Sequence, residues 1–162
     1  MDIRKIRLKN IIIFLFLIFL TSCTKTQQQQ ISQENIPAIS NDDVSVLTPE
    51  QVVILYFQAW NDKKYDVMYS LISDGFKQIE PTAKTFDEFK AYMEKFYDTA
   101  LSVSIVEAKE SYRTDKEAGI DYKIEITKKD GTKKELDSVY TLKKRANGWK
   151  LIHPYGENID TS

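Results

Sequence analysis

Residues 120–127 read Ile-Asp-Tyr-Lys-Ile-Glu-Ile-Thr, a strict alternation of apolar and polar side chains. Because successive side chains of a strand point to opposite faces of a sheet, this pattern predicts a half-buried β-strand. Asp130-Gly131 follows and predicts a tight hairpin turn, and Asn147-Gly148 predicts a second one. With an earlier strand over about 101–112 and a last one over 149–153, the second half of the chain is expected to form an antiparallel meander.

The residues before this meander show the three- and four-residue apolar spacing of helices. Thr48-Pro49-Glu50-Gln51 combines an N-cap residue, a first-turn proline and a capping box, so it predicts a helix start. A short helix is expected over Tyr65–Ile72 and a short strand over Phe76–Ile79. Thr85-Phe86-Asp87-Glu88 is a second capping box and predicts another helix. Helices followed by an antiparallel sheet indicate an α+β fold, with the helices on one sheet face.

Cys23 ends an N-terminal segment that has the order of an export signal. Basic residues lie within Arg4–Lys9, and Ile11–Leu20 is an uninterrupted apolar run. That run suits a signal peptide and is too short for a membrane span, which needs about 20 apolar residues. Leu20-Thr21-Ser22-Cys23 resembles the bacterial lipobox. The resemblance implies that the thiol of Cys23 receives a diacylglyceryl group and that a peptidase cuts before it; a short uncleaved anchor with an incidental Cys is the alternative.

The chain is expected to have four parts. Residues 1–22 are the lipoprotein signal peptide, 23–47 the lipidated Cys and a disordered tether, 48–156 the folded domain and 157–162 a flexible tail. The tether is rich in Gln, Ser and Asn and keeps no helical or strand period. Two acyl chains hold a protein stably on a bilayer, so the expected location is the extracytoplasmic face of the cell membrane.

Composition excludes several classes of function. Cys23 is the single Cys, so the chain has no second thiol for a disulfide, a Cys-ligated zinc or a nucleophile. Removing residues 1–22 takes away four basic residues and one acid, which leaves 19 basic against 23 acidic residues. A mildly acidic domain lacks the basic face that nucleic acid requires, so no nucleic-acid partner is expected.

Two stretches carry a family resemblance: 59–65, Ala-Trp-Asn-Asp-Lys-Lys-Tyr, and 147–151, Asn-Gly-Trp-Lys-Leu. They resemble the helical hairpin and the terminal strand hairpin of the NTF2-like superfamily, over about residues 48–155. The resemblance implies a curved sheet wrapped round helices, a cone that can hold a pocket, and sheets that often form dimers. It implies no particular reaction, because this fold hosts enzymes, binding modules and assembly domains.

The ionisable residues do not form a recognisable catalytic set. His153 is the only histidine and is expected at the surface or rim of the last strand, with acid–base catalysis as the alternative. Asp98 is expected to be solvated near a helix end, although a buried carboxylate there would have a raised pKa. Asp121 and Glu125 should face solvent. With no phosphate loop, nucleophile elbow or metal-ligand pattern, no catalytic, cofactor or metal residue is assigned.

Two groups of side chains allow a binding function. Aromatic residues on predicted inward faces are expected to pack the core, with an apolar pocket as the alternative; they are Tyr56, Trp60, Tyr92, Phe96, Tyr122, Tyr140 and Trp149. Basic residues at strand ends are expected to form a solvated rim, with an anionic wall polymer or lipid as the alternative partner; they are Lys128, Lys129, Lys133, Lys134, Lys143, Lys144 and Arg145.

The resulting hypothesis is a membrane-anchored extracytoplasmic lipoprotein with a non-catalytic binding or assembly domain. Its partners would be the membrane through Cys23, a second copy of the chain, or an envelope protein or small ligand, with no cofactor. One alternative is a small cone-pocket enzyme of the ketosteroid isomerase or dehydratase type. Another is an accessory domain of an envelope assembly.

Overall fold

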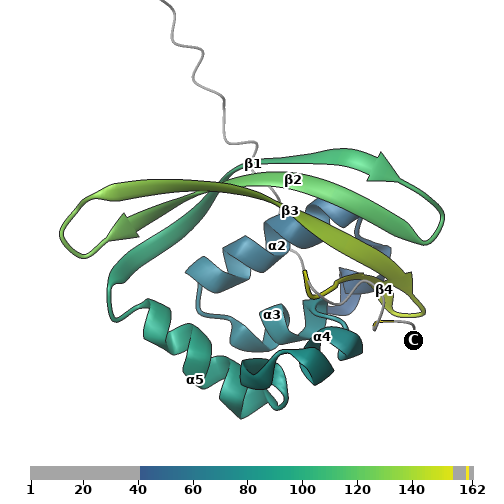
Figure 1. Cartoon of the computed structure of the whole chain (residues 1–162), viewed down its shortest axis with the longest axis horizontal. Coiled ribbons are helices and arrows are strands. Elements are labelled where there is room, and N and C mark those ends of the chain that lie inside the picture. The colour runs from purple at the N-terminus through teal and green to yellow at the C-terminus, as the bar shows by residue number, and fades with distance from the viewer. Residues whose placement is uncertain (1–40, 155–159, 161–162) are drawn as a thin grey trace, which may run out of the picture. The chain divides into compact units, whose positions relative to one another are not determined.

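The computed structural model describes residues 41–154 and residue 160, and the elements follow in the expected order of helices before strands (Figure 1). Cys23 and the predicted signal peptide lie outside the described residues. The helical elements are the 3₁₀ helix η1 (Asn41–Val46), α2 (Pro49–Asn61), α3 (Tyr65–Leu71), α4 (Asp74–Ile79), the 3₁₀ helix η2 (Pro81–Ala83) and α5 (Phe86–Phe96). The strands are β1 (Ala100–Arg113), β2 (Glu117–Lys128), β3 (Lys133–Arg145) and β4 (Gly148–Leu151).

The four strands form one antiparallel sheet in the order β1-β2-β3-β4. Figure 1 shows the sheet curling over α2, which packs against β1, β2 and β4. Ile124 of β2 lies opposite Ile105 of β1 and Leu136 of β3, so these three apolar side chains share one face of the sheet. The expected α+β fold, with N-terminal helices packed on a curved antiparallel sheet, is confirmed.

Both predicted capping boxes form. The Thr48 side chain accepts a hydrogen bond from the Gln51 amide, and the Gln51 side chain accepts one from the Thr48 amide. Thr85 and Glu88 make the same exchange at the start of α5. Each box pairs two amides that a helix start otherwise leaves without a helical partner, so the sequence sets both start points.

The prediction of a strand over Phe76–Ile79 is wrong, because these residues belong to α4. Ser73 caps that helix: its hydroxyl accepts a hydrogen bond from the Phe76 amide at 2.9 Å. Gly75 is buried in the first turn, where a Cβ would stand 2.5 Å from Cγ of Asp160. The close contact with Asp160 therefore explains why position 75 is a glycine. The Ser73 cap explains why a helix starts here.

The core lies between the concave sheet face and the helices. Its largest fully buried members lie in α2, α3, β2, β3 and β4 or directly after α3 and β4; they are Phe57, Met68, Leu71, Ile72, Ile120, Leu142, Leu151 and Ile152. Val44 of η1 and Leu47, which directly follows η1, are also buried. Among the described residues, no helix is both long and apolar enough to cross a membrane.

A bulge in β1 explains why one apolar residue of this strand is exposed. The β1–β2 register shifts between Ala100 and Ser102, and Leu101 at this bulge is 59% exposed. Two further shifts follow along β1. Because a bulge bends a strand and increases its twist, these shifts help the long β1–β2 hairpin to curve around α2.

Both predicted hairpin turns depend on a glycine with a positive φ. Gly131 has φ of 82° and Gly148 has φ of 99°. A Cβ on Gly148 would also lie 2.9 Å from the Val44 carbonyl oxygen and from Cα of Ser45. The second turn thus serves two purposes: it reverses the chain and lets η1 pack directly on the β3–β4 hairpin.

Candidate functional site

Aromatic rings fill the space between α2 and the concave sheet face. Tyr122 and Tyr140 stack with centroids 4.8 Å apart, and Phe57 lies 5.0 Å from Tyr122. Trp60 packs against Phe96 of α5 at 4.6 Å. Rings this close leave no room for a ligand between them, so the aromatic residues act as core here.

Two tyrosine hydroxyls in this interior, those of Tyr56 and Tyr140, are protonated at neutral pH. Burial, with Tyr56 as the next contribution, raises the pKa of Tyr140 well above its usual value. Burial, then Tyr122, also raises the pKa of Tyr56. These two hydroxyls therefore cannot serve as general bases near pH 7.

Six of the seven aromatic residues predicted to point inward are buried or partly buried, and Tyr92 is not. Its side chain is 54% exposed on α5, whose buried positions are Phe89 and Met93. The buried face of α5 is narrow, and Tyr92, the residue before Met93, lies outside it. The prediction for Tyr92 is therefore wrong, although that for Trp149, which is buried, is correct.

His153 is buried, not at a surface or rim as expected. Its Nε2 lies 3.4 Å from Oε2 of Glu80, and its ring stands edge-on to Phe76 at 5.0 Å. Glu80 also accepts hydrogen bonds from the Thr82 amide at 3.1 Å and the Thr82 hydroxyl at 2.7 Å. The histidine therefore ties the end of the sheet to the α4–η2 corner.

Glu80 gives the domain a pH dependence whose sign follows from its partners. Hydrogen bonds from Thr82, then the contact with His153, lower the pKa of Glu80 below its usual 4.5. The carboxylate therefore stabilises the fold above the unfolded-state pKa, and this contribution is lost as pH falls through the folded-state pKa. We expect the melting temperature of Glu80→Gln to lie about 2–6 °C below wild type at pH 6, and the gap to close towards pH 2.5.

Thermal scans by circular dichroism from pH 2.5 to 7 measure this gap. Glu107→Gln, at an exposed position of β1, is the matched control and should show no pH-dependent gap. A gap for Glu80→Gln that widens on acidification would contradict the assignment.

The acidic residues considered in the sequence do not converge. Asp98 is exposed in the turn after α5, as expected. Asp121 is exposed on the sheet face away from the helices, while Glu125 on the same face forms an ion pair with Lys133 at 2.9 Å. The side chain of His153 lies away from both, against Phe76 of α4 and Glu80, which precedes η2. The described residues contain no group of three His, Cys, Asp or Glu side chains that could hold a metal ion.

Several of the predicted basic rim residues have partners. Besides Lys133, Lys144 lies over the Trp149 ring at 5.8 Å. Lys143 donates to the Asp160 carbonyl oxygen at 2.7 Å, and Arg145 pairs with the Asp160 carboxylate. Asp160, the one described residue of the predicted tail, is buried. The basic side chains are thus divided among separate contacts.

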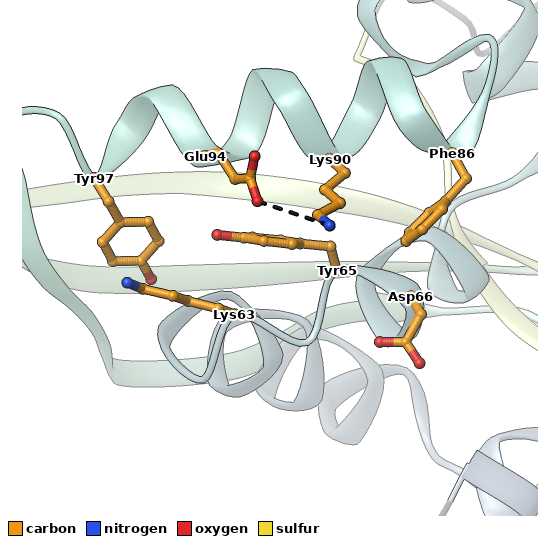
Figure 2. Close-up of a pocket in the computed structure, with 7 residues that line it drawn as sticks. All are labelled: Lys63, Tyr65, Asp66, Phe86, Lys90, Glu94 and Tyr97. Atoms are coloured by element: carbon orange, nitrogen blue, oxygen red, sulfur yellow. Dashed lines mark ion pairs between the residues drawn. The ribbon is translucent and has the colours of Figure 1, made fainter.

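A pocket of about 580 Å³ opens between α3 and α5 (Figure 2). We call it the α3–α5 groove; its lining is Lys63, Tyr65, Asp66, Phe86, Lys90, Glu94 and Tyr97. Three of these residues lie on α5 and a fourth, Tyr97, is its C-cap; their intervals of four, four and three place them in one stripe on the helix surface. The other three come from the α2–α3 turn and the first turn of α3.

The groove has an aromatic floor with charges of both signs. Tyr65 is 6% exposed and lies in its middle, and Figure 2 places Phe86 with Asp66 at one end and Tyr97 with Lys63 at the other. Lys63 Nζ stands 4.5 Å from the centre of the Tyr97 ring. Burial, then Tyr65 and Asp62, raises the pKa of Tyr97 to about 12, and its hydroxyl donates to the Trp60 carbonyl oxygen.

No sequence pattern described above predicts this groove. Lys63, Asp66, Lys90 and Glu94 carry no recognisable motif and were given no role. The stripe Phe86, Lys90, Glu94 and Tyr97 was a readable signal, since it mixes aromatic and charged residues on one helix face. What faces this stripe depends on how α3 packs, which local sequence patterns do not determine.

One known family matches the chain. Residues 48–154 match the family described as "NTF2-like N-terminal transpeptidase domain". The match covers every element from α2 to β4. No curated protein has significant sequence similarity to the chain.

The solved structures to which the chain is similar have little sequence identity to it. A SEC-C motif containing protein from Rhodopseudomonas palustris has a TM-score of 0.50 at 13% identity, covering 67% of this chain and 78% of that one. An NTF2-like protein of unknown function from Burkholderia pseudomallei has a TM-score of 0.45 at 12% identity, covering 63% and 86%. A ketosteroid isomerase-like protein from Erwinia carotovora atroseptica has a TM-score of 0.44 at 19% identity, covering 69% and 92%.

Proposed function

The chain belongs to the family of NTF2-like N-terminal transpeptidase domains, and we propose that it is a lipid-anchored, extracytoplasmic binding domain without catalytic activity. Its task would be to hold a protein partner close to the outer face of the cell membrane. The family description names transpeptidases, which favours a partner from envelope assembly.

The filled interior carries this proposal. An enzyme of the cone-pocket type needs an open cavity with at least two converging ionisable groups. Here Phe57, Trp60 and Tyr140 occupy that space, and the pKa of Tyr140 is raised far above neutrality. The remaining open surfaces are suited to contact with another macromolecule.

The membrane anchor is supported by the sequence of the N-terminus. A basic segment, a ten-residue apolar run and two small residues precede Cys23 in the order that lipidation requires. Two acyl chains hold the mature protein on the membrane, and residues 24–40 separate the anchor from η1. The proposed location is the extracytoplasmic face of the cell membrane.

Self-association through the outer sheet face is a second candidate, favoured by apolar residues exposed there. Val139 and Tyr112 lie opposite Asp121 and Gly119, on the face away from the helices, and both are exposed. The family resemblance implies dimers through this face. A second copy of the chain is therefore the alternative partner.

Photo-crosslinking in cells tests the proposal. p-Benzoylphenylalanine would replace Phe86 in the α3–α5 groove, Val139 on the outer sheet face, or Lys116 in the β1–β2 turn as a matched exposed control. We expect a discrete protein adduct from Phe86 or Val139, absent from Lys116 and lost when Cys23→Ser removes the anchor. An adduct of twice the chain mass from Val139 identifies self-association. No discrete adduct from either position would contradict the binding function.

A further inference from the structure

We propose that the α3–α5 groove binds an extended peptide segment of about five residues, with a cationic side chain at one end, an acidic one at the other, and an aromatic residue or proline between them. This inference rests on the proposed binding function and adds the place and the chemistry of the contact. The partner is a protein segment in extended conformation.

The length of the groove sets the length of the ligand. Tyr97, the C-cap of α5, comes eleven positions after Phe86, and a helix rises 1.5 Å per residue, so the stripe is about 16 Å long. An extended chain advances about 3.3 Å per residue, so about five residues fit along it. The pocket volume of about 580 Å³ is within the usual range for binding sites.

The charges of the groove set the order of the ligand's charges. In the middle, Lys90 and Glu94 are 4.0 Å apart and balance each other. Asp66 lies beside Phe86 at one end, and Lys63 lies beside Tyr97 at the other (Figure 2). A cationic side chain of the ligand is therefore attracted to the Asp66 end, and a carboxylate of the ligand to the Lys63 end, because each meets the opposite charge. A simple anion would gain little from a lining with two cations and two carboxylates.

The aromatic floor sets the middle of the ligand. Tyr65 is buried at the floor between the charged ends, and Phe86 at the rim is 37% exposed. Aromatic grooves bind extended proline-containing segments, whose preformed conformation loses little entropy on binding. Tyr97 is held by its hydrogen bond to the Trp60 carbonyl oxygen, so this side chain is ordered before a ligand arrives.

The test uses the full chain in detergent micelles and a fluorescein-labelled peptide, Arg-Pro-Tyr-Pro-Glu, read by fluorescence anisotropy. We expect saturable binding that weakens about two- to fivefold in Asp66→Asn and in Lys63→Gln, as exposed ion pairs do. The matched controls are Asp87→Asn and Lys84→Gln, at exposed positions outside the groove lining. Both controls should bind as the unmodified chain does.

A second peptide makes the test specific. Replacing the peptide's Arg by citrulline removes its charge and should abolish the effect of Asp66→Asn while leaving that of Lys63→Gln. No saturation at millimolar peptide, or equal losses in the control variants, would overturn the groove assignment. A crosslinked adduct from Val139 together with absent peptide binding would contradict the peptide site in the groove, but it would support the proposed binding function.

Discussion

Replacing Phe57 with Ala is expected to lower the free energy of unfolding by about 3–5 kcal/mol. Phe57 is 1% exposed, and its ring lies within 6.1 Å of four other aromatic rings, those of Tyr56, Trp60, Tyr122 and Tyr140. Removing the ring leaves a cavity that rigid neighbours cannot close. Since domains of this size are stable by about 5–15 kcal/mol, the loss is a large share of the total.

Urea denaturation followed by tryptophan fluorescence measures this loss, because Trp60 reports on the same cluster. Phe86→Ala is the matched control: it removes the same ring from the exposed rim of the groove and should cost less than about 1 kcal/mol. A loss below about 1 kcal/mol for Phe57→Ala as well would mean that the interior is loosely filled. The cone-pocket enzyme would then regain support.

Much of the fold could be predicted because its signals are local. The alternation at Ile120–Thr127 reproduces the faces of β2, since one strand face packs on α2 and the other meets solvent. The capping boxes at Thr48 and Thr85 are complete within four residues. The two hairpin turns need a positive φ, which Gly131 and Gly148 adopt without a steric cost. Each of these features carries its own physical cause in a few adjacent residues.

The errors arise where tertiary contacts decide. Gly75 made α4 hard to predict, because glycine is unfavourable in helices. It is a glycine because a Cβ there would collide with the side chain of Asp160, far along the chain. Leu101, Val103 and Ile105 alternate with polar residues, but the bulge between Ala100 and Ser102 leaves Leu101 59% exposed. His153 is buried against Phe76, which belongs to the segment wrongly predicted as a strand, and against Glu80, which directly follows that segment. These causes cannot be read from the neighbouring residues.

The candidate site, too, could be predicted only where local patterns determine it. Helical and strand periods predicted that aromatic residues such as Tyr56 and Tyr140 face inward, and packing as core was the preferred interpretation. The α3–α5 groove needed the packing of two helices, so its charged residues looked like ordinary solvated side chains. The role of Cys23 is the reverse case: sequence order alone supports it, and it lies outside the described residues.

Cys23→Ser is expected to abolish lipid attachment completely. A hydroxyl does not replace the thiol as acceptor of the diacylglyceryl group, as the lipobox resemblance implies. Without that group the peptidase step is not expected, so the variant should keep residues 1–22 and migrate as a heavier precursor. Ser22→Ala is the matched control, because it keeps a small residue beside the cleavage point and should be processed normally.

Labelling of growing cells with radioactive palmitate, followed by isolation of the chain, tests the central claim most directly. The account predicts label in the unmodified chain and in Ser22→Ala, and none in Cys23→Ser. Label of normal intensity in Cys23→Ser, or an unmodified chain without label, would contradict a lipid anchor at Cys23.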